Sequence, residues 1–331
     1  MSNNSLQLAK KAKNDEFYTK YKDIEAELTA YYNYNPNVFS NKIILCPCDD
    51  PEQSNFVQFF INNFEKYNLK AFIATSYSPH SEHGKLLVMT SPNAVITKSL
   101  NGNGDFRSEE VTKLKEQADI IVTNPPFSLF RDFLQWIFDN NKKFIVLGNK
   151  NAITYRDIFP LIKYNKMWLG TTSPKEFITP GSSRATKKVS GLTRWFTNVE
   201  HGMRHKPMVL HTMDYNLSHS KTLQKKLAQY GANNCYPHYD NYDAIEVPVV
   251  KCIPNDYKGI MGVPITFLDN YDPSQFEIVG NFDNSGLSNK PKYGYVPSQS
   301  ALAIIKGNKQ MWNGPIVNQH ALYKRICIKL K

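Results

Sequence analysis

Short apolar runs alternate with helix-forming segments through the first half of the chain, and this alternation constrains the fold more than any other feature. The apolar runs are 43–45, 71–74, 120–122 and 144–147, and helical spacing follows the first of them, as in Phe56, Phe59 and Phe60. Two further runs, 86–89 and 94–96, predict a hairpin. Strands that alternate with helices form a mostly parallel sheet covered on both faces, so the sequence predicts a doubly wound α/β fold.

The alternation fades after residue 149. Residues 191–197 predict one late strand, and the chain beyond His205 becomes rich in Tyr, Asn, Pro and Gly. A chain of 331 residues is long enough for two medium-sized domains. We therefore expect a catalytic part at residues 1–205 and a second part at residues 206–331.

Charge points to a polyanionic partner. The chain holds 40 Lys and Arg against 29 Asp and Glu, which gives a formal charge of +11. Residues 177–199 include four basic residues and no acidic one, and residues 284–331 include eight basic residues and no acidic one. The alternative is charge that serves solubility alone, but two separate acid-free stretches favour contacts with phosphates.

The cysteines predict a reduced, cytoplasmic protein. Five cysteines without a signal peptide or a long apolar run indicate no disulfide framework and no membrane segment. Cys46 and Cys48 form a C-x-C pair, but a zinc site needs a second ligand pair and the other cysteines are scattered. His80 and His83 likewise lack a third ligand. We expect no metal.

Asn124-Pro125-Pro126-Phe127 directly follows the run 120–122, where a parallel sheet carries its active site. An exocyclic amino nitrogen is a poor nucleophile because its lone pair is delocalised into the ring of the base. The Asn124 side-chain oxygen and the Pro125 carbonyl can accept both N–H bonds, the prolines stiffen the loop, and Phe127 can stack on the base. The alternative is a Pro-Pro turn that ends the strand. The motif favours methylation of an amino group by positioning, without a general base.

Six ordered segments extend this pattern, and with them the chain resembles the EcoRI-type family of adenine-N6 DNA methyltransferases. The segments are 14–19, 45–51, 104–106, 124–127, 195–198 and 261–268. The resemblance implies a Rossmann-like class I methyltransferase fold, S-adenosylmethionine as cofactor and double-stranded DNA as substrate. It also suggests a cognate restriction endonuclease as a genetic partner, action as a monomer, and GAATTC as the first DNA site to test.

The resemblance assigns contacts to the methionine end of the cofactor. Residues near the N-terminus would bind this end: Phe17, Tyr18 and Thr19. Residues after the first strand would lie beside its ammonium group: Cys48, Asp49 and Asp50. Charge agrees, because the ammonium and the sulfonium are both cationic. The alternative for the two aspartates is a cap of the next helix.

By the same resemblance, Asp105 and Phe106 would hold the cofactor's adenine, the first through its carboxylate and the second through its ring. Two departures from the common methyltransferase pattern stand out. The glycine-rich loop is absent after the first strand, and the strand after Lys70 lacks the acid that usually binds ribose hydroxyls. The ribose contacts are therefore not assigned.

DNA contacts are expected in the acid-free stretch 177–199. An adenine inside a duplex must be rotated out, at a cost of roughly a few kcal/mol, and held in a pocket. The candidates for stacking and phosphate contacts are Arg184, Lys187, Lys188, Arg194, Trp195 and Phe196. The alternative for Trp195 and Phe196 is that both are core residues of a late strand. Residues 206–331 would form the target-recognition region.

Two other functions are compatible with the motif. Methyltransferases that act on protein glutamine or on structured RNA share the Asn-Pro-Pro-aromatic motif, and the missing glycine loop leaves open a DNA-binding protein on a degenerate methyltransferase scaffold. The basic C-terminal part and the order of the motifs favour DNA, and the intact motif favours catalysis.

Overall fold

The computed structural model describes residues 18–78, 81, 83–178, 186–188, 193–282 and 314–331. The chain divides into two compact units. Unit 1 comprises residues 1–152 and 167–202, and unit 2 comprises residues 153–166 and 203–331. The second part thus begins near the expected boundary, but it also takes up residues 153–166, which the sequence assigned to the catalytic part. That excursion was not predicted.

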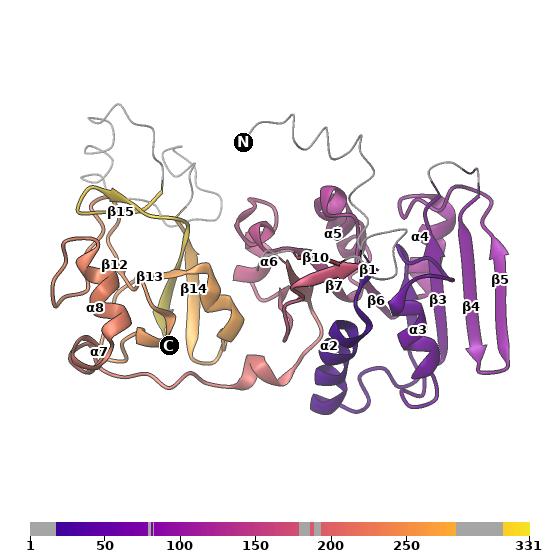
Figure 1. Cartoon of the computed structure of the whole chain (residues 1–331), viewed down its shortest axis with the longest axis horizontal. Coiled ribbons are helices and arrows are strands. Elements are labelled where there is room, and N and C mark those ends of the chain that lie inside the picture. Colours follow the sequence, from indigo (N-terminus) through magenta and orange to yellow (C-terminus); the bar gives the residue numbers. More distant parts are fainter. Residues whose placement is uncertain (1–17, 79–80, 82, 179–185, 189–192, 283–313) are drawn as a thin grey trace. The chain divides into compact units, whose positions relative to one another are not determined.

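An eight-stranded sheet forms the centre of unit 1, in the order β5-β4-β3-β2-β6-β7-β11-β8 (Figure 1). The strands are β2 (Ile43–Cys46), β3 (Ala71–Ser76), β4 (Lys85–Ser91), β5 (Ala94–Ser99), β6 (Ile120–Thr123), β7 (Lys143–Asn149), β8 (Trp168–Leu169) and β11 (Thr193–Thr197). The four central strands are parallel. The outer strands run antiparallel to their neighbours, and β4 and β5 form the predicted hairpin. The predicted α/β class with a parallel centre is confirmed.

Helices cover both faces of this sheet. On one face, α2 (Tyr21–Tyr34) and α3 (Asn55–Asn62) share a buried apolar cluster with strand residues such as Ile44, Ile120 and Ile145. On the other face lie α4 (Glu109–Gln117) and α5 (Phe130–Phe138). There Phe130 packs on Phe196 with ring centroids 5.1 Å apart. The central strands are therefore buried on both faces, which explains their continuous apolar runs.

Local sequence sets the start of these helices. Ser54 and Ser108 cap α3 and α4, each accepting a hydrogen bond from a backbone N–H of the first turn. In α4, Glu109 and Glu110 occupy the first turn and Lys115 the last, in agreement with the helix dipole. These starts fix where the loops after β2 and β5 end.

A small antiparallel sheet in unit 1 was not predicted. Its strands are β1 (Tyr18–Thr19), β9 (Glu176–Ile178) and β10 (Thr186–Lys188), in the order β1-β9-β10. Thr19 pairs with Phe177, and Lys187 pairs with the same residue from the other side. The sheet therefore brings the N-terminal segment beside residues more than 150 positions later in the chain.

Unit 2 is built on a four-stranded sheet in the order β12-β13-β17-β14. Its strands are β12 (Ile245–Glu246), β13 (Met261–Pro264), β14 (Phe276–Asn281) and β17 (Arg325–Leu330), and its helices are α6 (Phe159–Lys163), α7 (Met213–His219) and α8 (Lys221–Ala228). β15 (Ile316–Val317) pairs with β16 (His320–Ala321). No helix among the described residues combines the length and the apolar character needed to cross a membrane.

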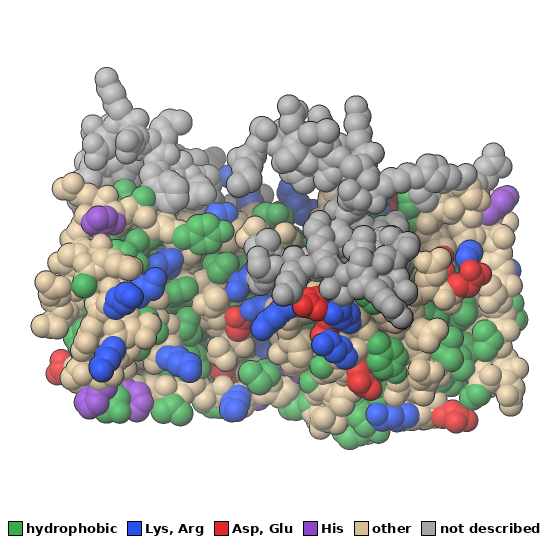
Figure 2. Space-filling view, in the orientation of Figure 1, with side chains coloured by type: hydrophobic (Ala, Val, Ile, Leu, Met, Phe, Trp, Pro, Cys, Tyr) green, Lys and Arg blue, Asp and Glu red, His purple; other side chains and the backbone are tan. Residues whose placement is uncertain are grey.

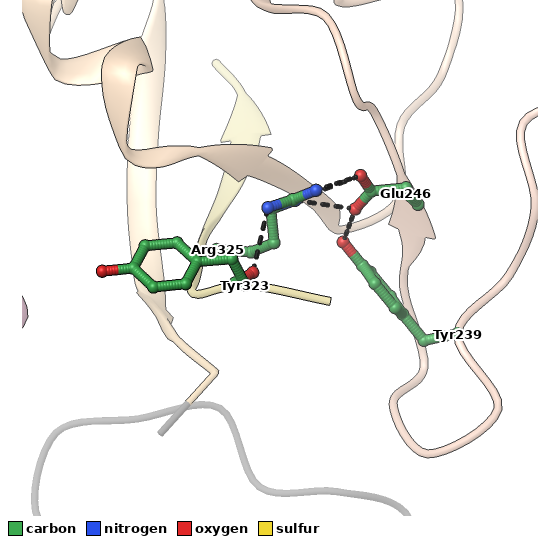
Figure 3. Close-up of polar contacts among 4 residues, drawn as sticks. All are labelled: Tyr239, Glu246, Tyr323 and Arg325. Carbon is green, nitrogen blue, oxygen red and sulfur yellow. Dashed lines mark hydrogen bonds and ion pairs between the residues drawn. The ribbon is translucent and has the colours of Figure 1, made fainter. Parts of the chain in front are cut away.

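A buried polar cluster joins three segments of unit 2 (Figure 3). The fully buried Glu246 carboxylate accepts from Arg325 Nη2 at 2.8 Å and Nε at 3.0 Å, and from the Tyr239 hydroxyl. Arg325 Nη1 donates to the Tyr323 carbonyl at 2.9 Å. A Cβ on Gly262 would lie 2.0 Å from the Tyr239 hydroxyl, so glycine makes room for the cluster. Such a cluster is costly to break, because either partner left alone is a buried charge.

Candidate active site

The order of the strands reverses between β2 and β6, since the chain continues from β2 to β3 on one side and later places β6 on the other. Open α/β sheets bind ligands at the carboxyl ends of the strands beside such a switch point. The predicted cofactor loop leaves β2 there, and the predicted motif leaves β6. Thr123 Oγ1 donates to Asp49 Oδ2 at 2.5 Å, so the two segments are joined directly.

Asp49 is the buried acid of this junction, with 6% of its surface exposed. Its Oδ1 accepts from Ser54 Oγ at 2.7 Å, and its backbone N–H donates to the Thr75 carbonyl at the end of β3. Burial raises the pKa of Asp49 to about 7, against the opposing effect of the two hydroxyl hydrogen bonds. The carboxylate therefore changes its charge near neutral pH.

The cap of the following helix is Ser54, whose hydroxyl accepts from Phe56 N at 3.0 Å. The alternative role of the aspartates as the cap of α3 is thereby excluded. The Asp50 carboxylate accepts from Glu52 N at 2.8 Å and lies 3.6 Å from Lys85 Nζ. Cys48 is half-buried beside this pair. The two carboxylates and Cys48 thus all lie at the carboxyl end of β2.

The motif Asn124 to Phe127 connects β6 to α5 through a short 3-10 helix, η1 (Phe127–Leu129). The Pro126 carbonyl accepts from Leu129 N at 2.9 Å and begins this turn. Pro125 is buried, whereas Asn124, Pro126 and Phe127 are half-buried, and the Phe127 ring packs against the core on the α2 and α3 face. Asn124 and Phe127 therefore keep some accessible surface on a stiff loop at the tip of a central strand, although the Asn124 side-chain oxygen itself is buried.

Asp105 and Phe106 follow a close backbone approach at the end of β3. Gly104 has a φ of +80°, and a Cβ there would lie 2.0 Å from the Ser76 carbonyl oxygen. The Asp105 carboxylate accepts from Arg107 Nη2 at 2.6 Å and Nε at 2.9 Å, and Arg107 lowers the pKa of Asp105. Asp105 is therefore a half-exposed, ionised group held in place by Arg107.

Phe106 lies deeper than expected. Only 4% of its surface is exposed, and its ring packs edge-on against Phe133 and Trp136, with centroids 5.0 and 5.5 Å away. The role of Phe106 beside the cofactor's adenine stays a prediction, and little of the residue is accessible for such a contact.

The N-terminal residues of the predicted site lie partly outside the described residues. Phe17 is outside them, and only the backbone of Tyr18 is described. Thr19 is buried, and its carbonyl accepts from Asn55 Nδ2 at 2.8 Å. Asn55 directly follows Ser54, which holds Asp49. The cap and the first residue of α3 therefore hold Asp49 and Thr19 close together, a link that no sequence motif indicated.

The prediction that Trp195 and Phe196 stack on an extruded base is wrong. Both side chains are fully buried in β11. Trp195 packs edge-on against Phe56 on one face of the sheet, and Phe196 packs against Phe130 on the other. They are core residues, because helices cover both faces of this strand.

The basic candidates remain predictions. Arg194 is half-buried and donates to the Thr193 carbonyl at 3.2 Å. Lys187 and Lys188 lie in β10, where the backbone alone is described, and Arg184 lies outside the described residues. Among the side chains that the structure does describe, no group of three or more His, Cys, Asp or Glu could hold a metal ion.

The sequence is similar to those of known adenine-specific methyltransferases. The family model of the adenine-specific methyltransferase EcoRI matches residues 5–331. The type II methyltransferase M.EcoRI of Escherichia coli is 40% identical over 312 residues, which cover 84% of this chain and 89% of that protein. M.MgeORF184P of Mycoplasma genitalium is 37% identical over 340 residues and 97% of each chain. M.MpnI of Mycoplasma pneumoniae is 39% identical over 288 residues, 82% of this chain and 83% of that protein. No solved structure matches. The chain therefore belongs to the EcoRI family of adenine-specific methyltransferases.

Proposed function

We propose that this chain transfers a methyl group from S-adenosylmethionine to N6 of an adenine rotated out of duplex DNA at a specific site. The observation that carries the proposal is the hydrogen bond from Thr123 to Asp49 at the switch point. It joins the carboxylate expected beside the cofactor to the motif expected to hold the base. The relatives named type II methyltransferases support a modification role, with a restriction endonuclease as a genetic partner.

The residues at the switch point fit S-adenosylmethionine, which supplies a methyl group on a positively charged sulfur. The cofactor's amino-acid end carries an ammonium, and the carboxylates of Asp49 and Asp50 lie at the carboxyl end of β2. Asp105, held ionised by Arg107, is an acceptor for the amino group of the cofactor's adenine. Carboxylates here favour a cationic ligand over the anionic phosphates that a glycine-rich loop would bind.

The motif residues act on the target base. The Asn124 side-chain oxygen and the Pro125 carbonyl accept the two N–H bonds of the adenine amino group, which favours a tetrahedral nitrogen with its lone pair free to attack. The stiff loop presents these acceptors before the reaction starts. Phe127 stacks on the base. No side chain removes a proton, because the methylated amine loses one readily to water.

Duplex DNA is the partner that the charge of the chain favours. On the face seen in Figure 2, Lys, Arg and His side chains gather over the region of α7 and α8, with little acidic surface. The exposed lysines of α8 are Lys221, Lys225 and Lys226. We infer that unit 2 takes part in recognition of the DNA target. We also infer that the protein acts as a monomer and methylates one strand at a time.

Asn124→Ala tests the mechanism, with methyl transfer to a GAATTC duplex as the first assay. The loss of one acceptor should lower kcat by about 100-fold or more. The dissociation constant of S-adenosylmethionine should stay within about threefold, because Asn124 holds the base and not the cofactor. Asn124→Asp keeps an acceptor oxygen and should retain measurable turnover. Asn93→Ala, in the exposed β4–β5 turn, is the matched control.

Unchanged kcat in Asn124→Ala would refute the assignment of the motif. Transfer to RNA or to a protein in place of duplex DNA would keep the motif chemistry and refute the substrate. Modified-base sequencing of DNA from cells that express the chain would then identify the site, if GAATTC is not methylated.

A further inference from the structure

Glu27 of α2 is a fully buried carboxylate that takes no part in the mechanism above. Its Oε1 accepts from Thr171 N at 2.8 Å and from the Tyr31 hydroxyl at 3.0 Å. Its Oε2 accepts from Thr172 N at 2.7 Å and Oγ1 at 2.6 Å, and from Thr171 Oγ1 at 2.9 Å. Burial raises the pKa of Glu27, and these hydrogen bonds oppose the shift. A buried carboxyl group is tolerated only when its acceptors are used, as they are here.

Glu27 fixes a loop of the chain to α2. The loop is residues 170–173, which we call the Glu27 loop. The Glu27 loop is packed closely at this point, because a Cβ on Gly170 would lie 2.1 Å from Glu27 Oε1 and 2.6 Å from Trp195 Cβ. On its other side, Gly170 N donates to the Trp195 carbonyl and Ser173 Oγ donates to the Thr193 carbonyl, both at 2.9 Å. The Glu27 loop is therefore held between α2 and β11.

The Glu27 loop leads into β9, and β9 pairs with β1. β1 in turn runs directly into α2, where Lys20 Nζ forms an ion pair with Glu176 of β9. These connections close a ring: α2, the Glu27 loop, β9, β1 and α2 again. Glu27 is one polar link of that ring, and the Lys20–Glu176 ion pair is another. Glu27 fixes the Glu27 loop to α2, and through β9 it contributes to the position of β1 relative to α2.

β1 carries Thr19, which Asn55 ties to the segment that holds Asp49. We propose that Glu27 is a positioning residue for cofactor binding: it fixes β1 beside the Asp49 loop, so that the methionine end of S-adenosylmethionine meets a preformed site. This inference rests on the proposed function. It requires a carboxylate, because both oxygens accept backbone N–H bonds at once, whereas a glutamine offers one acceptor oxygen and turns an NH2 toward the remaining donors.

Glu27→Gln tests the proposal, with Glu246→Gln as the matched control. Both remove a fully buried carboxylate, the first in unit 1 and the second in unit 2, so both should lower the melting temperature. Calorimetric titration of each full-length variant with S-adenosylmethionine, without DNA, measures the affinity directly. Glu27→Gln should raise the dissociation constant and KM about tenfold, as expected if β1 then occupies its binding position only about one tenth of the time, with kcat within about threefold. Glu246→Gln should bind like wild type.

Wild-type affinity in a folded Glu27→Gln variant would overturn the proposal, as would an equal loss in both variants, which would indicate general destabilisation. If Glu27→Gln does not fold, Thr172→Val removes one donor and keeps the backbone; it should weaken binding about threefold, and no change would overturn the proposal. A wild-type chain that binds no S-adenosylmethionine would refute the proposed function instead.

Discussion

Two carboxylates of the predicted cofactor site, Asp49 after β2 and Asp105 after β5, have pKa values shifted in opposite directions. Arg107 keeps Asp105 ionised, whereas burial brings Asp49 close to neutrality, with a pKa of about 7. A cationic ligand beside Asp49 binds to the charged form of the carboxylate and competes with the proton. Cofactor affinity should therefore follow the ionisation of Asp49 in the physiological range.

We expect the dissociation constant of S-adenosylmethionine to rise as pH falls below about 7, approaching tenfold per pH unit. The sign follows from the raised pKa of Asp49, because acidification neutralises the carboxylate that we propose lies beside the cofactor's ammonium group. Asp49→Asn should bind more weakly and with a flat pH profile. Calorimetric titrations from about pH 6 to 8 measure both, and a flat wild-type profile would contradict the assignment.

The sequence predicted site residues where one local motif determines them. Asn124 to Phe127 follow a short apolar strand, so their place at the end of β6 could be predicted directly, and their chemistry stays a prediction. Trp195 and Phe196 could not be assigned in this way. Strand alternation shows that they point to opposite faces, but not that helices cover both faces. Asn55 was missed because its partner, Thr19, lies 36 positions away in the sequence. Ser54 was missed although its partner Asp49 is only five residues away, because Ser54 is not part of the motif that the resemblance covers.

Among the elements, length decides what the sequence can predict. β2, β3, β6 and β7 have four to seven residues, and their apolar runs were recognised. β1, β8, β9 and β10 have two or three residues each and carry no periodicity. Their pairing is set by distant contacts such as the one between Glu27 and Thr172. Such contacts leave no local signal.

The segment after β5 should be sensitive to one added methyl group. In Gly104→Ala, the new Cβ would meet the Ser76 carbonyl oxygen at 2.0 Å in a left-handed backbone. Gly231 also has a left-handed backbone, with φ +67°, but a Cβ in Gly231→Ala would meet no atom within 4 Å. Gly231→Ala should cost about 1–2 kcal/mol of unfolding free energy. Gly104→Ala should cost more and should also weaken cofactor binding, because Asp105 is the next residue.

Chemical denaturation and cofactor titration of both alanine variants check this prediction. Equal losses of stability would show that the Ser76 contact relaxes freely. Unchanged cofactor affinity in Gly104→Ala would contradict the assignment of Asp105 to the cofactor site.

At the scale of the whole molecule, the excursion of residues 153–166 into unit 2 limits where the chain can be cut. α6 lies in this segment, packs against β14, and buries Phe159 and Ile162. A chain shortened to residues 1–202 keeps α6 but loses β14. The exposed side chains would each forfeit about 1.5–3 kcal/mol of burial and form an apolar patch.

We expect the 1–202 chain to self-associate in light-scattering and sedimentation measurements. The same chain with Phe159→Ser and Ile162→Ser should remain monomeric, since it lacks the patch. A monomeric 1–202 chain without these substitutions would show that α6 does not need β14.

The chain passes between the two units three times, after residues 152, 166 and 202. This path has a consequence for the exchange of specificity between related genes. A single crossover near codon 203 would combine the α6 of one parent with the β14 of the other, and their packing surfaces would have to match. Hybrids should inherit a new unit 2 intact only when the shorter stretch that encodes residues 153–166 is exchanged together with the stretch from residue 203 onward.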